Sequence, residues 1–310
     1  MKIAVTGGSG FIGSHVVDQL VAAGHDVLVL DGRRPDYAPH VAHRNVDVVD
    51  VDAMTAALRG VDIVYHLAGA SDVDKALNDP LGTVRLNVQG TASVAEAARR
   101  NNVRRVIFAS TVWVYGATVG DSPLSETAPV SLADAGHIYT STKLAGEMVL
   151  HSFAELYDLR FTILRYGIPY GPRMRDALVI AKFVQKALAG QRLTIAGDGL
   201  QVRNFVYVED LARAHVLALD DAAQNEVLAL DGAVPVTIRE IAETVIELVG
   251  TPVAIERVPA RPGDYAGRVI STERAAEVLG WHATTPFREG VRQYLDWYTD
   301  QRNAEAEQAS

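Results

Sequence analysis

The chain has 310 residues, of which 48% are hydrophobic, and this length is enough for one large α/β core with a smaller appended lobe. A net charge of −9 and a pI near 5.5 argue against nucleic acid or an anionic membrane surface as the main partner. The absence of cysteine excludes disulfides, thiolate chemistry and sulfur-bound metals, and no window approaches roughly eighteen uninterrupted apolar residues, so we expect a soluble cytoplasmic protein with no metal site.

The first thirty-one residues predict a strand, a tight turn, a helix and a second strand. Residues 2–5 form a short apolar run rich in β-branched side chains, a glycine-rich stretch follows at 6–13, and apolar residues recur at helical spacing over 11–23. Residues 26–30 give the second strand, which ends at Asp31.

The glycine-rich stretch indicates a cradle for a pyrophosphate. Gly7, Gly10 and Gly13 carry no side chains that would block the approach of backbone N–H groups to phosphate, and the start of the next helix favours the negative charge. Asp31 follows Gly13 by eighteen residues, at the tip of the second strand. This context favours a dinucleotide-binding site over a bare turn.

Asp31 also bears on the choice of cofactor. Its carboxylate can accept hydrogen bonds from both adenosine ribose hydroxyls and would repel a 2′-phosphate, so NAD is favoured over NADP. Arg33 and Arg34 leave NADP open, because they could serve that phosphate, although arginines in a polar loop are more often solvated.

Strands and helices then alternate as far as residue 165. The expected strands are 45–49, 62–67, 105–109 and 160–165, and the expected helices are 52–59, 80–100 and 138–157. This alternation implies a Rossmann-type doubly wound α/β fold, with a mainly parallel sheet and ligands beyond the carboxyl ends of its strands. Functional residues should therefore follow directly on strands.

Beyond residue 172 the alternation weakens. We expect helices at 177–189, 210–219, 238–249 and 287–298 and a returning strand at 226–230. The prediction is an NAD-binding domain of residues 1–167 to which 199–231 return, and a smaller C-terminal α/β substrate-binding lobe of 168–198 and 232–298. Residues 299–310 should form a polar, frayed tail.

Tyr139, Lys143 and Thr111 are the candidates for catalysis. Tyr139 and Lys143 are four residues apart on an expected helix and so share a face. A nearby ammonium stabilises a phenolate, which can then take a proton from an alcohol, and Thr111, just after a strand, could hydrogen-bond the same alcohol. This Tyr–Lys spacing alone usually marks an ordinary helix surface, so the interpretation depends on its combination with the glycine-rich stretch.

The chain resembles the short-chain dehydrogenase/reductase superfamily, and within it the extended branch that works on nucleotide sugars. The matching motifs cover nearly the whole length in the right order: 6–13 (TGGSGFIG), 66–69 (HLAG), 87–91 (NVQGT), 110–116 (STVWVYG), 139–143 (YTSTK), 164–166 (LRY), 170–172 (YGP), 203–210 (RNFVYVED) and 261–264 (RPGD). The resemblance implies that Tyr139 is the catalytic base, Lys143 its electrostatic partner and a nicotinamide-ribose ligand, and Thr111 the third member.

The resemblance also implies a set of binding residues. Those expected to contact NAD are Gly7, Gly10, Phe11, Ile12, Gly13, Asp31, Gly32, Asp47, Val48, Leu67, Ala68, Gly69, Asn87, Ser110, Tyr139, Lys143 and Tyr166, with Asp47 and Val48 beside the adenine. Those expected to contact a nucleotide-sugar substrate are Thr111, Trp113, Ile168, Arg173, Arg175, Arg203, Arg261 and Asp264. Arg203 and Arg261 would grip the diphosphate, whose oxygens suit guanidinium donors. Asp210 and Asp264 fit structural partners better than catalysts.

Three positions depart from patterns known in this branch. Ile168 replaces a usual asparagine, which removes one expected substrate hydrogen bond. Dehydratases carry an Asp-Glu pair straight after the threonine, and sugar-acid decarboxylases place a Glu at the position of Trp113, whereas this chain has Val112 and Trp113. Elimination is therefore disfavoured.

The resemblance thus implies an NAD-dependent 4-epimerase, an isomerase acting on UDP-glucose and UDP-galactose or on the corresponding uronates, whose C6 carboxylate Arg173 or Arg175 could meet. The alternatives are a nucleotide-sugar ketoreductase, dehydrogenase or decarboxylase, and an NAD-sensing regulator, against which the retained Tyr139, Lys143 and Thr111 count. The family commonly pairs two subunits through the helices carrying Asn87 and Tyr139. We therefore expect a homodimer, packed through the small residues Ala92, Ala95, Ala97 and Ala98.

Overall fold

The computed structural model describes residues 1–116, 123–130, 136–259 and 269–309, and it divides into two compact units. The first unit comprises Met1–Gly167, Ala212–Leu230 and Ile270–His282, and the second comprises Ile168–Leu211, Asp231–Val269 and Ala283–Ser310. No helix in the described ranges is long and apolar enough to cross a membrane.

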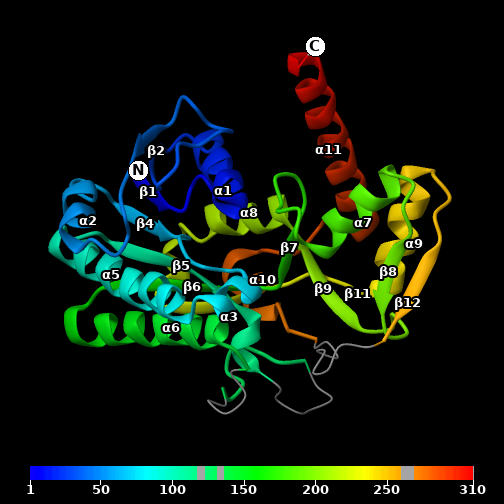
Figure 1. Ribbon diagram of the computed structural model, residues 1–310. Coiled ribbons are helices and arrows are strands. Elements are labelled where there is room, and N and C mark those ends of the chain that lie inside the picture. The colour runs from blue at the N-terminus through cyan, green and yellow to red at the C-terminus, as the bar shows by residue number, and fades with distance from the viewer. Residues whose placement is uncertain (117–122, 131–135, 260–268, 310) are drawn as a thin grey trace. The chain divides into compact units, whose positions relative to one another are not determined.

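The first unit is built on a seven-stranded parallel sheet in the order β10-β6-β5-β4-β1-β2-β3 (Figure 1). The strands are β1 (Lys2–Thr6), β2 (Asp26–Leu30), β3 (Ala42–Arg44), β4 (Ile63–His66), β5 (Arg105–Thr111), β6 (Arg160–Tyr166) and β10 (Glu226–Leu230). The strand order reverses between β1 and β4, the position at which doubly wound sheets bind their ligands beyond the strand ends. The predicted Rossmann-type fold is confirmed.

Helices cover both faces of this sheet. They are α1 (Phe11–Ala22), α2 (Val51–Ala57), α3 (Val73–Asn78), α4 (Pro80–Val84), the π-helical turn η1 (Arg85–Gln89), α5 (Gly90–Arg100), α6 (Ile138–Tyr157), α10 (Glu273–Leu279) and, from Ala212 onward, α8 (Val208–Leu217). Helices α2, α5 and α6 enclose one buried core, which contains Val64 of β4 together with Met54, Val94 and Leu150. The next residue of β4, Tyr65, points to the other face and donates its hydroxyl hydrogen bond to the His215 carbonyl of α8.

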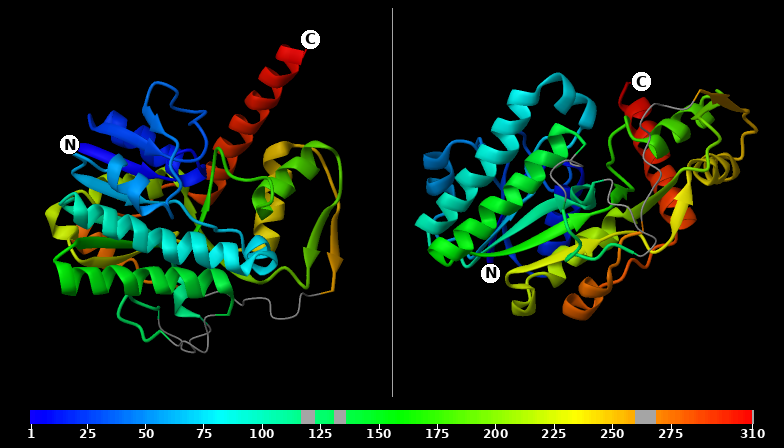
Figure 2. Two further views of the ribbon diagram at one scale, coloured as in Figure 1. Left: turned by 60° about the vertical axis from the view of Figure 1, so that its left-hand side comes forward. Right: turned by 90° about the horizontal axis from the view of Figure 1, so that it is seen from below.

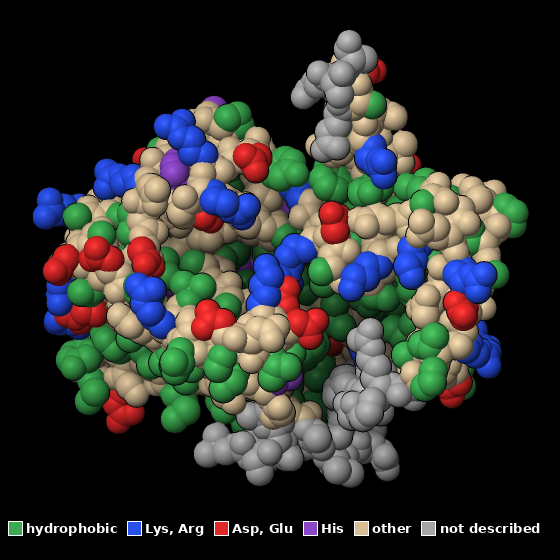
Figure 3. Space-filling model, in the orientation of Figure 1, with side chains coloured by type: hydrophobic (Ala, Val, Ile, Leu, Met, Phe, Trp, Pro, Cys, Tyr) green, Lys and Arg blue, Asp and Glu red, His purple; other side chains and the backbone are tan. Residues whose placement is uncertain are grey.

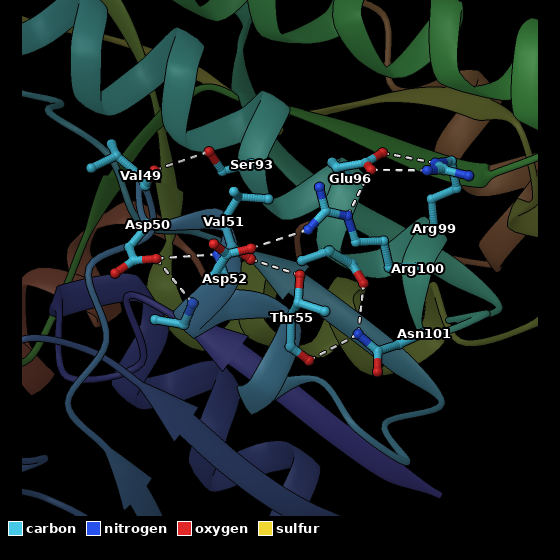
Figure 4. Close-up of polar contacts among 12 residues, drawn as sticks. Val49, Asp50, Val51, Asp52, Thr55, Ser93, Glu96, Arg99, Arg100 and Asn101 are labelled. Carbon is cyan, nitrogen blue, oxygen red and sulfur yellow. Dashed lines mark hydrogen bonds and ion pairs between the residues drawn. The ribbon is translucent and has the colours of Figure 1, made fainter.

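Helices α5 and α6 lie side by side on this face (Figure 2). Helix α2 is tied to α5 by polar contacts drawn in Figure 4, among them the ion pair of Arg100 with Asp52 at 3.2 Å and the hydrogen bond from Asn101 to the Thr55 carbonyl at 2.9 Å. Ala95, Ala97 and Ala98 of α5 are fully buried inside the same unit's core. The expectation that these alanines pack against a second subunit is therefore wrong.

The described residues of the second unit form two small sheets and several helices. One sheet has the order β11-β9-β7 and consists of β7 (Ile168–Tyr170), β9 (Val202–Tyr207) and β11 (Pro235–Thr237), and the other pairs β8 (Leu193–Ala196) with β12 (Ile255–Val258). The helices are α7 (Val179–Leu188), α9 (Ile238–Val249) and α11 (Phe287–Ala309). Tyr170, Phe205 and Phe287 pack their rings together and join the three-stranded sheet to α11.

Several predicted boundaries differ from the structure. Residues 199–211 belong to the second unit, because β9 pairs there with β7 and β11, and residues 270–282 belong to the first, where Ile270 bridges to Leu124. The expected strand at 45–49 is a turn, since the Asp50 N–H donates to the Asp47 carbonyl, and β3 lies just before it.

The expected frayed tail is wrong as well, since α11 continues to Ala309. Ion pairs one turn apart, such as Arg292 with Asp296 at 2.6 Å, and the Arg302 guanidinium over the Tyr298 ring support the helix along its exposed side.

Candidate active site

The glycine-rich turn closes tightly on itself between β1 and α1. The Gly10 N–H donates to the Gly7 carbonyl at 3.0 Å, and Gly7 has a φ of +71°. A Cβ added to Gly13 would lie 2.1 Å from the Gly7 carbonyl oxygen, so the backbone fold of the turn excludes any side chain at this position. Gly10 is the N-cap of α1 and brings no side chain to its first N–H groups, which suits an incoming pyrophosphate.

Asp31 joins this turn to the loop after β2. Its two carboxylate oxygens accept hydrogen bonds from the Ser9 N–H at 3.1 Å and the Arg33 N–H at 3.0 Å. Each oxygen retains acceptor capacity, so the carboxylate can also receive ribose hydroxyls. Gly32, Arg33 and Arg34 are exposed beside it. The geometry suits an adenosine ribose held by Asp31.

Asp47 and Val48 lie where α5 begins. Asp47 accepts a hydrogen bond from the Val49 N–H at 3.2 Å and pairs with Arg85 at 3.3 Å. Val48 is buried, and its Cγ2 lies 3.0 Å from the position a Cβ on Gly90 would take. The exposed carboxylate of Asp47 and the buried side chain of Val48 thus place a polar and an apolar group next to each other near the start of α5.

The end of β4 brings the cradle close to the catalytic helix. The Ala68 N–H donates to Thr6 Oγ1 at 3.2 Å, and a Cβ on Gly69 would lie 3.4 Å from Lys143 Nζ. The Asn87 side chain pairs with both backbone groups of Ala70 and donates to Thr142 Oγ1 at 2.9 Å. Asn87 therefore links the strand end to α6, and its side chain is fully engaged in that link.

Lys143 and Tyr139 lie one turn apart on α6. Lys143 is 5% exposed, donates to the Ala109 carbonyl at 2.8 Å and sits 4.9 Å from the centre of the Phe108 ring. Burial lowers the pKa of Lys143 to about 8, although the negative charge of Glu147 acts to raise it. Tyr139 is half-buried, and Thr111 ends β5 with its Oγ1 accepting from the Trp113 N–H at 3.2 Å.

The structure assigns a part to His137 that its sequence position did not reveal. Its Nδ1 accepts from the Thr140 N–H at 3.3 Å and so caps α6, while its ring lies 5.4 Å from that of Trp113 and 6.0 Å from that of Tyr139. Trp113 meets Tyr139 edge to face at 6.3 Å. The rings of Trp113 and His137 therefore both lie next to the ring of Tyr139.

A buried ion pair beneath the catalytic residues was also missed. Glu147, one turn after Lys143, binds Arg165 at 2.6 and 3.0 Å and accepts from the Ser110 hydroxyl at 2.5 Å. The sequence signal was a glutamate on the lysine's face of the helix and an arginine inside a buried strand. The hydroxyl of Ser110, a residue expected near NAD, thus donates its hydrogen bond to Glu147.

The remaining candidates fall into three groups. Phe11 and Ile12 begin α1 after the end of β1, and Leu67 directly follows β4. The Tyr166 hydroxyl is buried and forms a hydrogen bond of 2.6 Å with His215, so only other parts of Tyr166 could reach a cofactor. Ile168, Arg173, Arg175 and Arg203 belong to the second unit. Arg261 and Asp264 lie outside the described residues.

Within the second unit, Arg173 has a left-handed backbone with φ of +67°, and Arg175 is exposed. The Arg203 guanidinium donates to the Val202 carbonyl at 2.8 Å. Asp210 accepts three hydrogen bonds from Thr284 and Thr285 at 2.6 to 3.0 Å, which fits the structural role expected of it.

Comparison with known proteins identifies relatives over the whole chain. Residues 3–230 match the family model described as the NAD dependent epimerase/dehydratase family. A UDP-glucose 4-epimerase of Mycolicibacterium smegmatis is 34% identical over 96% of this chain and 98% of that protein.

Solved structures agree with the sequence relatives. The UDP-glucose 4-epimerase of Thermotoga maritima superposes with a TM-score of 0.91 at 31% identity, covering 97% of this chain and 100% of that one. A UDP-glucuronic acid 4-epimerase from Bacillus cereus, solved with UDP-glucuronic acid and NAD, has a TM-score of 0.87 at 28% identity over 97% and 100% of the two chains. Decarboxylases of UDP-glucuronic acid and a dTDP-glucose 4,6-dehydratase from Streptomyces venezuelae also match.

Proposed function

Because the chain belongs to the NAD-dependent epimerase/dehydratase family, we propose that it is an isomerase, a 4-epimerase of a nucleotide sugar. Membership confirms the resemblance carried by the motifs, and the family's dependence on NAD confirms the expected cofactor. The tight turn from Gly7 to Gly13, which has no room for a side chain at Gly13, and the Asp31 carboxylate fit the pyrophosphate and the ribose of that cofactor.

The reaction proposed is reversible oxidation at C4 of the sugar. The phenolate oxygen of Tyr139 takes the proton of the C4 hydroxyl, and the Lys143 ammonium, buried beside it on α6, stabilises the phenolate. Thr111 supplies a hydroxyl at the end of β5 for the same oxygen. Bound NAD supplies reversible acceptance of a hydride. After the 4-keto sugar has turned over, Tyr139 would return the proton to the C4 oxygen, which gives the C4 epimer.

One observation favours epimerisation over the other chemistries of the family. The short turn after Thr111 carries Val112 and Trp113 where dehydratases and decarboxylases of the family are expected to carry acids. Trp113 packs on His137 and Tyr139, so its indole occupies the place from which such an acid would act. Without a second acid, proton abstraction from C5 and loss of a hydroxyl lack a catalyst.

The substrate proposed is a UDP-sugar, either glucose and galactose or the corresponding uronates. UDP-glucose 4-epimerases are among the relatives by sequence and by structure, and a UDP-glucuronic acid 4-epimerase shares the fold. Arg203 would bind the diphosphate, and Arg173 or Arg175 would meet a C6 carboxylate if the sugar is a uronate.

The test is a panel of UDP-, dTDP- and GDP-sugars, neutral and uronic, incubated with the purified chain and NAD. We expect C4 epimers of one UDP-sugar to interconvert with no net NADH, and Tyr139→Phe to abolish this while the chain stays folded. Stoichiometric NADH would instead indicate a dehydrogenase, and released carbon dioxide a decarboxylase. Binding throughout the panel without turnover would indicate a regulator.

We also propose that two copies pair through α3, α4 and α6. Apolar side chains are exposed on these neighbouring helices: Leu77 (77%), Leu81 (82%), Met148 (60%) and Leu156 (69%). Figure 3 shows hydrophobic side chains gathered over α6. Exposed apolar side chains that gather on one face can mark a protein–protein interface.

Light scattering should give twice the chain mass of 33.4 kDa. Leu81→Glu should then halve that mass, whereas Leu188→Glu, a change of an exposed leucine elsewhere, should leave it unchanged. A wild-type chain at single mass would refute the pairing.

A further inference from the structure

We infer that His66 is a positioning residue that stays neutral and keeps one tautomer. Through it, a series of hydrogen bonds that all run in the same direction connects the NAD-binding turn to the catalytic helix α6. The inference rests on the proposed function only in that the turn holds NAD and α6 carries Tyr139 and Lys143. His66 ends β4 and is fully buried.

Both ring nitrogens of His66 have side-chain partners. Nδ1 lies 2.9 Å from Thr6 Oγ1, and Nε2 lies 3.1 Å from Thr91 Oγ1. Thr6 is fully buried at the end of β1, directly before Gly7, and Thr91 is 1% exposed on α5. The ring stacks on Phe108 at 5.7 Å with an angle of 29° between the planes. The imidazole is therefore held on its edges and on one face.

The donors and acceptors leave only one arrangement. The Thr91 hydroxyl donates its single hydrogen to the Asn87 carbonyl at 2.6 Å, so it must accept from a protonated Nε2 of His66. A neutral imidazole then presents Nδ1 as an acceptor, and Thr6 donates to it. Thr6 Oγ1 in turn accepts from the Ala68 N–H. The four hydrogen bonds therefore all point the same way, from the Ala68 N–H through the side chains of Thr6, His66 and Thr91 to the Asn87 carbonyl.

Each end of this chain meets residues of the candidate active site. Ala68 is followed by Gly69, whose added Cβ would lie 3.0 Å from Asn87 Oδ1 and 3.4 Å from Lys143 Nζ. At the other end, Asn87 lies in the π-helical turn η1 and donates to Thr142 beside Lys143. Such turns recur at functional positions in helices. The chain thus fixes the separation between the strand end and α6.

The surroundings require His66 to stay neutral. The Phe108 ring stacks on His66, and the Lys143 ammonium lies 4.9 Å from the centre of the same ring, so a protonated His66 would place a second cation close to the first. Protonated Nδ1 would also turn the acceptor for Thr6 into a donor. Burial, followed by the charge of Lys143, lowers the pKa of His66 to about 3, which agrees with a spacer rather than a pH switch.

The tautomer is tested first, by ¹⁵N spectra of the histidine-labelled full chain without any sugar, with His66→Gln used to assign the signal. We expect Nε2 protonated and Nδ1 bare, unchanged between about pH 5 and 8, where a free histidine titrates. Protonation on Nδ1, or titration in that range, would overturn the inference whatever reaction the protein catalyses.

The positioning role is tested by NAD binding to isosteric variants. Thr6→Val and Thr91→Val each break the chain in a buried place, and we expect NAD affinity to fall about tenfold; Thr6→Ser and Thr91→Ser keep the hydroxyl and should stay within about twofold of wild type. All are measured well below their unfolding temperatures. If the valine variants unfold at a lower temperature but bind NAD with wild-type affinity, the hydrogen bonds of His66 have only a structural role, and the proposal is overturned. A wild-type chain without NAD affinity would instead refute the cofactor site, and the tautomer result would still stand.

Discussion

Replacing Glu147 by glutamine should strongly destabilise the first unit, because the change strands a buried cation. The side chains of Arg165 and Glu147 are 7% and 3% exposed and meet at 2.6 Å. Removing one partner of such a pair typically costs about 3–5 kcal/mol, since the other charge stays buried and unpaired. Glutamine can still accept from the Ser110 hydroxyl, so we expect a loss near the lower end, about 3 kcal/mol.

The assay is urea unfolding followed by circular dichroism, with Asp52→Asn as the matched control. Asp52 pairs with Arg100 at 3.2 Å on the same unit, but its side chain is 89% exposed, and exposed pairs contribute about 0–1 kcal/mol. The double change Glu147→Gln with Arg165→Met removes both charges and should recover part of the loss. A loss below about 1 kcal/mol for Glu147→Gln, or strict additivity in the double variant, would refute the reasoning.

Three further changes test the site. Activity should fall as pH rises through about 8, where Lys143 in the folded chain loses its proton. The free energy of unfolding should instead rise between about pH 8 and 10.5, the ordinary pKa of a lysine, because in that range the unfolded chain still holds the proton that the folded chain has lost. Activity and stability that change in the same direction over this pH range would contradict this. Gly13→Ala should weaken NAD binding at least 100-fold by titration, since its Cβ meets the Gly7 carbonyl at 2.1 Å, whereas Gly24→Asn, with open space around it and a tolerated left-handed backbone, should bind normally. Asp31→Ser should raise the NADP-to-NAD affinity ratio by at least tenfold, and an unchanged ratio would remove Asp31 from the ribose site.

Local sequence patterns were enough to predict six of the seven strands of the first unit's sheet, all but β3. Apolar runs that end in glycines or acids mark β1, β2 and β4, and each signal lies within a few residues of the strand it predicts. The strands β3, β7, β8, β11 and β12 were missed because three or four residues carry too little periodicity, and β9 was missed although it has six residues. Only tertiary pairing, which the sequence does not display, makes them strands.

The candidate site divides in the same way. Residues recognised by a motif, such as Tyr139 and Lys143, could be named from the sequence. Residues defined by what they touch could not: His137 caps α6, and Glu147 neutralises Arg165 across the core. Asn87 and Ser110 were named for the cofactor, and the structure adds that their side chains also bond to protein groups. A motif fixes which residues matter, while the contacts decide how they act.

The most direct test of C4 epimerisation follows a deuterium label placed at C4 of the UDP-sugar. The account requires the C4 hydrogen to leave and return within one active site while Tyr139 handles only the hydroxyl proton. NMR of the product should therefore find the deuterium retained at C4 with inverted configuration, and none in the solvent. Loss of the label to water, or retention of the original C4 configuration in every product, would contradict the proposed reaction.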